Sequence, residues 1–317
     1  MSSTVATNRT HITTHIITVN APAPTVYGLI ADVTKWPYIF SPTVHVQTMQ
    51  LDDNNERLRL WALANGEVRT WASRRTLDPE CLRIRFHQVI TSPPVESMGG
   101  EWVIEPLADG STRVVLLHDF TIINDEPDDR AFVTKAVDHN SNAELASLKR
   151  AAELGDDFGL LVLTFSESVI VNAPVEKVYD FLYRADLWPE RLPHVARLEL
   201  TEPTPNVQSM EMDTRSTDGS IHTTKSVRVC FPSESIVYKQ TGTPEIMAAH
   251  TGRWDFTEKG DSVELSSTHT VVIRPEIIPK VLGPEGTVQL AREKIQHALS
   301  TNSMTTMKAA KAYGEST

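Results

Sequence analysis

The sequence contains few cysteines, only Cys81 and Cys230 among 317 residues. Two thiols cannot build the disulfide framework of a small secreted domain or a cysteine-rich zinc site. The first fourteen residues are polar and lack the apolar core of a secretory signal. No stretch approaches the roughly 18 apolar residues that a membrane-spanning helix needs. We therefore expect a cytoplasmic protein.

Positive charge is also scarce. The chain has 41 Asp and Glu residues against 30 Lys and Arg residues, which leaves a net charge of −11. Proteins that bind nucleic acid or anionic lipid surfaces do so through surplus cationic side chains. We therefore expect neither nucleic acid nor a membrane among the partners of this protein.

The common catalytic motifs are missing as well. The sequence has no nucleophile elbow, no phosphate-binding loop, no dinucleotide fingerprint and no His-Glu-x-x-His motif. Its eleven His residues are scattered without the spacing of metal ligands. We expect no metal and no cofactor, so any chemistry would have to come from side chains alone.

What the sequence does contain is an internal repeat with an offset of 152 residues. Three motifs recur at this offset: Val-Asn-Ala-Pro at 19–22 and 171–174, Trp-Pro at 36–37 and 188–189, and Gly-x-Trp at 100–102 and 252–254. A length of 317 residues suits two domains of about 150 residues each. We predict one domain over residues 1–155 and a second over residues 156–317, joined by a short link.

Each copy shows the same order of expected elements. A run with period two, at 11–19 and at 160–171, predicts a strand, and the following Pro marks a helix start. Helices are expected at 25–33 and 176–185, near each Trp-Pro, and at 128–154 and 284–312. Six further strands lie between. We predict an α+β protein of two helix-grip domains, each an antiparallel sheet curved around a long C-terminal helix with an interior cavity.

One strand in each copy carries a Ser-x-Arg pattern. Alternation along a strand places Trp71, Ser73 and Arg75 on one face, and Thr224, Ser226 and Arg228 on one face of the other copy. An arginine that faces the interior needs a carboxylate or an anionic ligand, because an unpaired buried charge is costly. The alternative, an arginine on the outer face of the sheet, is about equally compatible with the residues alone.

Taken together, Asn-Ala-Pro, Trp-Pro and Trp-x-Ser-x-Arg resemble the aromatase/cyclases of bacterial type II (aromatic) polyketide synthases. These belong to the START-like polyketide cyclase superfamily, whose di-domain members carry two such units. The resemblance covers residues 10–312 and places the family's pocket arginine at Arg75 and Arg228, and its strand serine at Ser73 and Ser226. Thr43 stands where the family has a pocket tyrosine, which leaves the proton donor unidentified.

The resemblance implies an enzyme that directs aldol closure of the first ring, between carbons 7 and 12, and then dehydration and aromatisation. The substrate would be a poly-β-ketone, reduced at carbon 9 and bound to an acyl carrier protein, with ketosynthase and ketoreductase as further partners. Arg75, Arg228, Ser73 and Ser226 are the catalytic candidates, because a guanidinium can stabilise a developing alkoxide. The candidates for substrate contact or proton relay are Trp36, Trp71, Trp102, His87, His118, Trp188, His194, His222, Tyr238, Trp254 and His269.

Other interpretations remain open at this level. The fold also serves carriers of hydrophobic ligands, so a non-catalytic binding protein is the alternative function. One copy could be catalytic and the other a packing partner, and the first copy keeps more of the pattern. Residues 139–142 of the first long helix are polar, and they face either a wet cavity or solvent.

Overall fold

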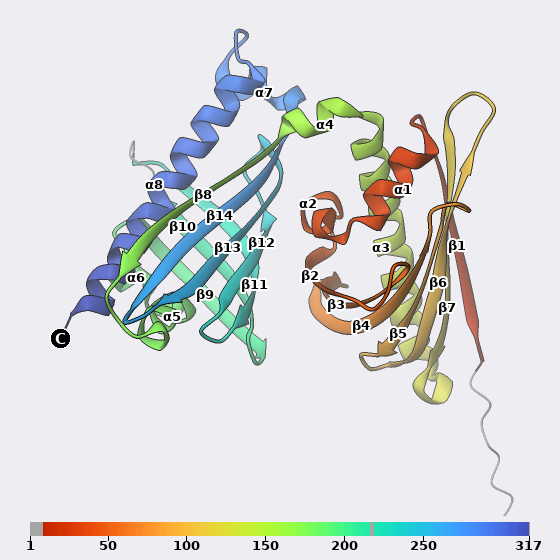
Figure 1. The fold of residues 1–317 in the computed structure, drawn as a ribbon, viewed down its shortest axis with the longest axis horizontal. Coiled ribbons are helices and arrows are strands. Elements are labelled where there is room, and N and C mark those ends of the chain that lie inside the picture. Colours follow the sequence, from red (N-terminus) through yellow and green to blue (C-terminus); the bar gives the residue numbers. More distant parts are fainter. Residues whose placement is uncertain (1–8, 216–218, 317) are drawn as a thin grey trace, which may run out of the picture. The chain divides into compact units, whose positions relative to one another are not determined.

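The computed structural model describes residues 9–215 and 219–316. The chain divides into two compact units, residues 1–158 and 159–317, so the units meet after residue 158 rather than after residue 155. Each unit contains one seven-stranded antiparallel sheet and one long helix that follows the last strand of that sheet (Figure 1). The helix-grip prediction is confirmed for both copies.

The first unit contains the predicted strand, two helices, six strands and long helix. Its main elements are β1 (His11–Val19), α1 (Ala23–Ala31), α2 (Trp36–Ile39), β2 (Thr43–Gln50), β3 (Asn55–Ala64), β4 (Glu67–Asp78), β5 (Arg83–Ile90), β6 (Val95–Pro106), β7 (Thr112–Ile122) and α3 (Pro127–Glu153). The strand order β1-β7-β6-β5-β4-β3-β2 is a meander from β2 to β7, with β1 added beside β7.

The second unit repeats this plan. Its main elements are β8 (Val162–Val171), α5 (Val175–Tyr183), α6 (Trp188–Arg191), β9 (Val195–Thr204), β10 (Val207–Arg215), β11 (Ile221–Phe231), β12 (Ser235–Gly242), β13 (Met247–Lys259), β14 (Ser262–Ile273), α7 (Ile278–Leu282) and α8 (Val288–Glu315). The strand order is β8-β14-β13-β12-β11-β10-β9. The link between the copies contains a short helix, α4 (Asp156–Leu161), which the sequence did not predict.

The repeated Asn-Ala-Pro motif starts the first helix of each copy. Pro22 precedes α1 with φ −62° and ψ 142°, and Pro174 precedes α5 with φ −58° and ψ 144°. Proline is already restricted to such a φ and has no N–H to leave unpaired at a helix start. The motif therefore ends the first strand and turns the chain into the helix.

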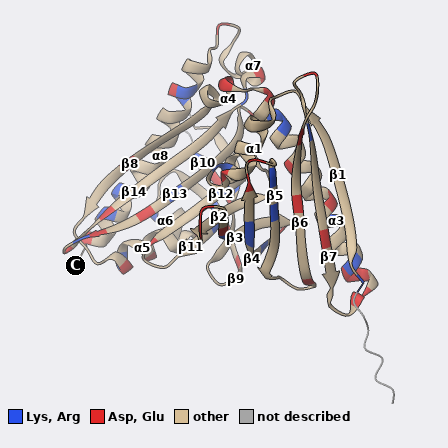
Figure 2. Ribbon diagram, turned by 45° about the vertical axis from the view of Figure 1, so that its right-hand side comes forward, with Lys and Arg blue, Asp and Glu red and all other residues tan. Residues whose placement is uncertain are grey.

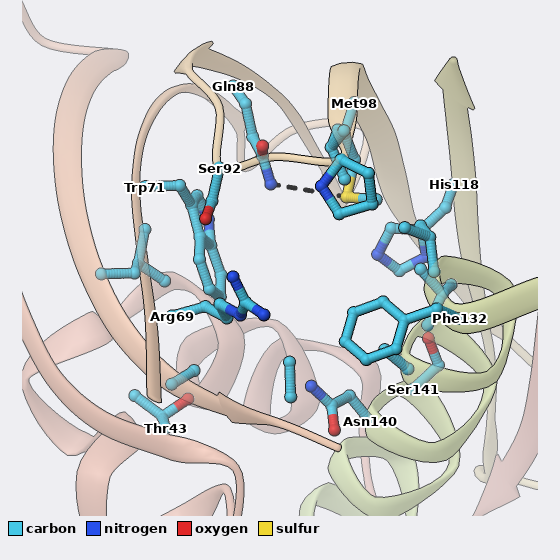
Figure 3. A pocket seen from close by; sticks show the side chains of 18 of the residues that line it. Thr43, Arg69, Trp71, Gln88, Ser92, Met98, His118, Phe132, Asn140 and Ser141 are labelled. Carbon is cyan, nitrogen blue, oxygen red and sulfur yellow. Dashed lines mark hydrogen bonds between the residues drawn. The ribbon is translucent and has the colours of Figure 1, made fainter. Parts of the chain in front are cut away.

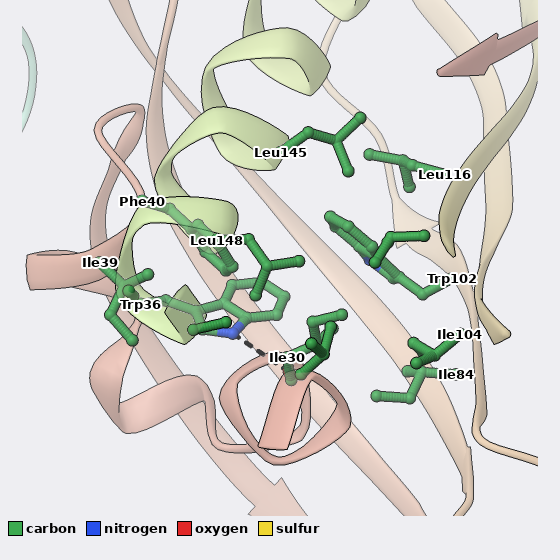
Figure 4. Close-up of a cluster of buried hydrophobic side chains, with 14 of the residues drawn as sticks. Ile30, Trp36, Ile39, Phe40, Ile84, Trp102, Ile104, Leu116, Leu145 and Leu148 are labelled. Carbon is green, nitrogen blue, oxygen red and sulfur yellow. Dashed lines mark hydrogen bonds between the residues drawn. The ribbon is translucent and has the colours of Figure 1, made fainter. Parts of the chain in front are cut away.

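The repeated Trp-Pro motif anchors the second helix on the first. The indole Nε1 of Trp36 donates a hydrogen bond of 3.1 Å to the carbonyl oxygen of Ile30 (Figure 4). Trp188 makes the matching bond of 3.2 Å to the carbonyl oxygen of Phe181. Both rings are at least nine-tenths buried, so each satisfies its one polar atom while it fills the core.

The repeated Gly-x-Trp motif makes room for an aromatic ring on the neighbouring strand. A Cβ at Gly100 would lie 2.6 Å from Cζ of Phe86 and 2.1 Å from the carbonyl oxygen of Leu117. A Cβ at Gly252 would lie 2.2 Å from Cζ of Tyr238. Only glycine fits such a close approach, so the motif fixes where these two rings lie.

Charged side chains on the outer faces of the sheets form ion pairs across strands. In Figure 2, Lys and Arg on β5 lie beside Asp and Glu on β6, where Arg83 and Arg85 both reach Glu101, at 3.2 and 2.9 Å. Within the described residues, no helix is both long enough and apolar enough to cross a bilayer.

Candidate active site

Strand register aligns one row of side chains across the inner face of each sheet. In the first domain the row is Glu56, Arg75, Phe86, Gly100 and His118, on β3 to β7. In the second domain it is Gln208, Arg228, Tyr238, Gly252 and His269, on β10 to β14. The two rows are structural counterparts, and both contain the arginine of the Ser-x-Arg pattern.

Arg75 faces the interior and is paired with a carboxylate, so it is not the pocket arginine that the resemblance implied. Its side chain is 2% exposed and donates from Nε to Glu56 Oε1 at 2.7 Å. Its Nη1 and Nη2 donate to the carbonyl oxygens of Ile30 and Ala31 at the end of α1, at 3.0 and 2.7 Å. The contact with Glu56 pairs the buried charge, and the two contacts with carbonyl oxygens hold α1 on the sheet.

The first domain nevertheless contains an interior cavity of about 150 Å³ between the sheet and α3. Figure 3 shows Arg69 and Trp71 of β4 on one side and His118 of β7 on the opposite side. Phe132, Asn140 and Ser141 of α3 complete the wall. Most of the wall is apolar, with a small number of convergent polar groups, as is typical of a site for an organic substrate.

His118 is the predicted relay residue that does line this cavity. Burial lowers the pKa of its imidazole to about 4, so the ring is neutral at physiological pH. Its Nδ1 is buried and has no hydrogen-bond partner among the described residues. The ring packs edge-on against Phe86 at a centroid distance of 5.4 Å. The imidazole is therefore oriented by packing and free to exchange a proton with a ligand.

Glu144 of α3 also lines the cavity, and sequence reasoning missed it. Burial raises the pKa of its carboxyl group to about 7. Among the described residues it forms no hydrogen bond or ion pair. A signal was present, because Glu144 follows Val133, Val137 and Ser141 at helical spacing along the buried stripe of α3. A carboxylate among buried residues either forms an ion pair or hydrogen bond with another residue or belongs to a functional site.

Arg69 is the cation of the cavity, and sequence reasoning missed it too. It lies two residues before Trp71 and therefore on the same face of β4. Its Nη2 bonds to Glu67 at 2.7 Å and its guanidinium lies 5.8 Å from the ring centre of Phe132. Unlike Arg75, it remains partly exposed and can turn toward a ligand.

The other candidates of the first domain fall into three groups. Trp36 and Trp71 line the cavity. Ser73 and Trp102 are buried beside it, at 4% exposure each, but do not line it. His87 is exposed. Ile84 and Gln88 face the interior, and alternation along β5 therefore places His87 on the outer face, so the expectation that it contacts substrate was wrong.

In the second domain the candidates lie mainly in the core. Trp188, Ser226, Arg228 and Trp254 are buried. His194 is half-buried, and burial lowers the pKa of its ring. His222 is exposed and lies 3.1 Å from the hydroxyl of Ser220. Tyr238 and His269 come together, with 3.1 Å between the phenol oxygen and Nδ1.

The sequence left open whether the polar residues 139–142 of α3 face a cavity or solvent, and the structure shows some of them on each side. Asn140 and Ser141 line the cavity, whereas His139 and Asn142 lie on the outward face of α3. Among residues 9–215 and 219–316, no three His, Cys, Asp or Glu side chains converge on a position that could hold a metal ion.

Comparison with known proteins agrees with this architecture. Both halves match families described as polyketide cyclase/dehydrase and lipid transport, over residues 9–153 and 171–300. The granaticin polyketide synthase bifunctional cyclase/dehydratase of Streptomyces violaceoruber is 40% identical over 94% of this chain and 92% of its own length. The actinorhodin polyketide synthase bifunctional cyclase/dehydratase of Streptomyces coelicolor is 43% identical over 95% of this chain and 96% of its own.

Solved structures support the same assignment. The crystal structure of the di-domain ARO/CYC BexL superimposes with a TM-score of 0.86 at 48% identity, over 97% of this chain and 99% of that chain. The di-domain ARO/CYC StfQ from the steffimycin biosynthetic pathway gives a TM-score of 0.81 at 37% identity, over 96% and 98%. Since identity is high and coverage nearly complete in both sequence and structure, this chain belongs to the polyketide cyclase/dehydratase family and is a di-domain aromatase/cyclase.

Proposed function

We propose that the cavity of the first domain directs first-ring aldol closure, between carbons 7 and 12, and dehydration of a carbon-9-reduced poly-β-ketone. The chain would arrive as a thioester of an acyl carrier protein, within a synthase that also supplies a ketosynthase and a ketoreductase. The observation that carries this proposal is that two titratable groups, His118 and Glu144, line one largely apolar cavity and have no hydrogen-bond or ion-pair partner among the described residues at His118 Nδ1 or the Glu144 carboxyl group.

The apolar wall is suited to impose one conformation on a reactive chain. A poly-β-ketone cyclises by several routes in water, so the enzyme must bring one pair of carbons together. Trp71 and Phe132 offer flat surfaces on opposite sides of the cavity. Positioning two reacting carbons in contact can supply several kcal/mol of the barrier, on the order of 7–11 at best.

Ring closure begins with loss of a proton from a methylene between two carbonyl groups. Neutral His118 can accept that proton, which leaves an enolate in the chain. The enolate carbon then attacks a ketone carbonyl, forming the new C–C bond and an alkoxide. Arg69 is the cation placed to stabilise the oxygen anion, and the protonated His118 or Glu144 can return a proton to it.

Dehydration needs an acid and a base at the same time. Glu144 has a pKa of about 7, so at neutral pH about half of the molecules carry the proton that would leave with the hydroxyl as water. Neutral His118 can take the C–H proton on the neighbouring carbon. The products are one double bond, one water, an ionised Glu144 and a protonated His118, and transfer between the two groups restores the starting state.

The alternative function, a non-catalytic carrier of hydrophobic ligands, has less support. A carrier of neutral lipids gains nothing from burying an unpaired carboxyl group, which costs free energy. Membership in an enzyme family also favours catalysis.

The test is reconstitution of the purified protein with a minimal synthase and a ketoreductase, followed by identification of the products. The wild type should yield the dehydrated carbon 7 to 12 aromatic ring. His118→Ala and Glu144→Gln should shift the products toward uncyclised or undehydrated compounds. Unchanged products from both variants would refute the role of this cavity.

A further inference from the structure

The inner row of side chains differs in charge between the two domains. In the first domain Arg75 bonds to the carboxylate of Glu56 at 2.7 Å. In the second domain the register replaces Glu56 by Gln208, opposite Arg228. The amide Nε2 of Gln208 bonds to Glu202 at 2.9 Å. Arg228 therefore forms no ion pair with any described residue.

Arg228 is consequently a buried cation with an unused donor. It is 2% exposed, and its Nη2 donates to the carbonyl oxygen of Leu182 at 2.5 Å. Its Nη1 is buried and has no hydrogen-bond partner within the described ranges. The ring of Trp188, 5.3 Å away, offers only a cation–π contact. A buried charge of this kind is stabilised by an anion. Glu202 acts on Arg228 electrostatically, but no described carboxylate forms an ion pair with its guanidinium.

The next positions in the row are also more polar in the second domain. Tyr238 replaces Phe86, and His250 replaces Met98. The phenol oxygen of Tyr238 and Nε2 of His250 each lie 3.1 Å from the same atom, Nδ1 of His269. Burial lowers the pKa values of His250 to about 3 and of His269 to about 4, so both rings are neutral.

One nitrogen of a neutral imidazole carries either one proton or one lone pair. Nδ1 of His269 can therefore form one strong hydrogen bond, although two polar groups point at it. In either tautomer, Tyr238 or His250 retains an unused hydrogen-bonding group. Such a group is costly in a buried site unless a ligand engages it.

Three polar positions of the second domain correspond to residues that line the cavity in the first domain, whereas Arg75 and Phe86, the counterparts of Arg228 and Tyr238, do not line it. The cavity residues Gln88, Met98 and His118 have Gln240, His250 and His269 as their counterparts. Oε1 of Gln240 and Nδ1 of His250 are buried and lack partners in the part of the chain that the structure describes. Unpaired polar atoms thus gather where the first domain has its cavity.

We propose that the second domain has its own ligand site, in which Arg228 and the Tyr238–His250–His269 cluster bind the anion of an enolised 1,3-dicarbonyl compound. The two oxygens of such an enolate share one charge, and they accept hydrogen bonds from a guanidinium on one side and a phenol or imidazole on the other. The inference that this site binds an anion depends only on the inner row of side chains in the second domain. That the natural ligand is a cyclised polyketide intermediate rests on the proposed function.

Titration calorimetry on the full-length protein tests this site. The probe is 2-acetylcyclohexane-1,3-dione, a cyclic triketone that is ionised at neutral pH, with its uncharged methyl enol ether as the control ligand. We expect the enolate to bind and the ether to bind at least about tenfold more weakly, as for loss of one charged hydrogen bond. Arg74→Ala, an exposed substitution in the first domain, should leave this binding unchanged.

Gln208→Glu is the decisive variant, because it gives Arg228 the carboxylate that Arg75 already has. It should weaken enolate binding about tenfold or more, whereas the neutral Gln208→Met should not. Tyr238→Phe, which copies Phe86, should also weaken binding and serves as the test if Gln208→Glu does not fold.

The proposal is overturned if the enolate does not bind, if the ether binds equally well, or if Gln208→Glu and Tyr238→Phe both keep wild-type affinity. Loss of binding in His118→Ala alone would place the anion in the first domain and would also overturn it. The activity of Glu144→Gln tests the proposed function separately, so either proposal can fail without the other.

Discussion

Arg75 and Glu56 form a buried ion pair on the inner face of the first sheet, with 2.7 Å between Nε and Oε1. The same guanidinium donates to two carbonyl oxygens at the end of α1. One side chain thereby connects β3, β4 and α1. Its role at the cavity is indirect, because its guanidinium lies 5.1 Å from the ring centre of Trp36, which lines the cavity.

Replacing Arg75 by Ala should destabilise the first domain by about 3–5 kcal/mol, because it leaves Glu56 as an uncompensated buried charge. Urea denaturation of the full-length protein, followed by circular dichroism, measures the loss. The matched control is Arg74→Ala, an exposed neighbour on the same strand, for which we expect a change within about 0.5 kcal/mol. Equal stability of the two variants would contradict a structural role for the pair.

Glu144→Gln should lower the rate of dehydration by about 10²–10⁴-fold, because the amide cannot supply a proton. Product formation by the reconstituted synthase measures this rate. Glu126→Gln is the control, since it makes the same change at an exposed position just before α3. A similar loss in both variants would argue against a specific acid at Glu144.

The free energy of unfolding should decrease with rising pH because of Glu144. Its pKa rises from about 4.5 in the unfolded chain to about 7 in the folded one. The folded state therefore holds a proton that the unfolded state has lost, and the contribution of Glu144 disappears as pH rises from about 4.5 to about 7. Glu144→Gln should remove this dependence.

The measurement is the free energy of unfolding of the wild type and Glu144→Gln between pH 4.5 and 8. His118 acts in the opposite direction, because burial lowers its pKa to about 4 and its contribution is lost as pH falls. The difference between the two proteins isolates Glu144. A difference that stays constant with pH would show that this carboxyl group is not desolvated.

Gly252→Ala should destabilise the second domain, because the new Cβ would lie 2.2 Å from the ring of Tyr238. The added substitution Tyr238→Leu should recover much of the lost stability. In the first domain Phe86→Leu should not rescue Gly100→Ala, since that Cβ also meets the backbone oxygen of Leu117 at 2.1 Å. Thermal unfolding of the four variants compares the two cases, and equal rescue would contradict this difference.

The sequence by itself determined the two-copy architecture and the helix starts. Repeated motifs such as Asn-Ala-Pro and Trp-Pro act through local geometry, since proline restricts φ and an indole bonds to the helix just before it. Alternation along a strand also predicted that Ser73 shares a face with Arg75, and Ser226 with Arg228. It left open whether that face is the inner or the outer one, and the structure places both arginines on the inner face.

Only the tertiary structure decided what these inner side chains meet. Glu56 and Gln208 lie about 19 or 20 residues before their arginines, and only the strand register brings each pair together. His87 and His118 are both histidines on strands, yet one faces solvent and one the cavity. Glu144 has its raised pKa because the packed sheet removes water around α3. Local patterns determine secondary structure, whereas charge, pairing and acidity depend on which distant residues share the same buried space.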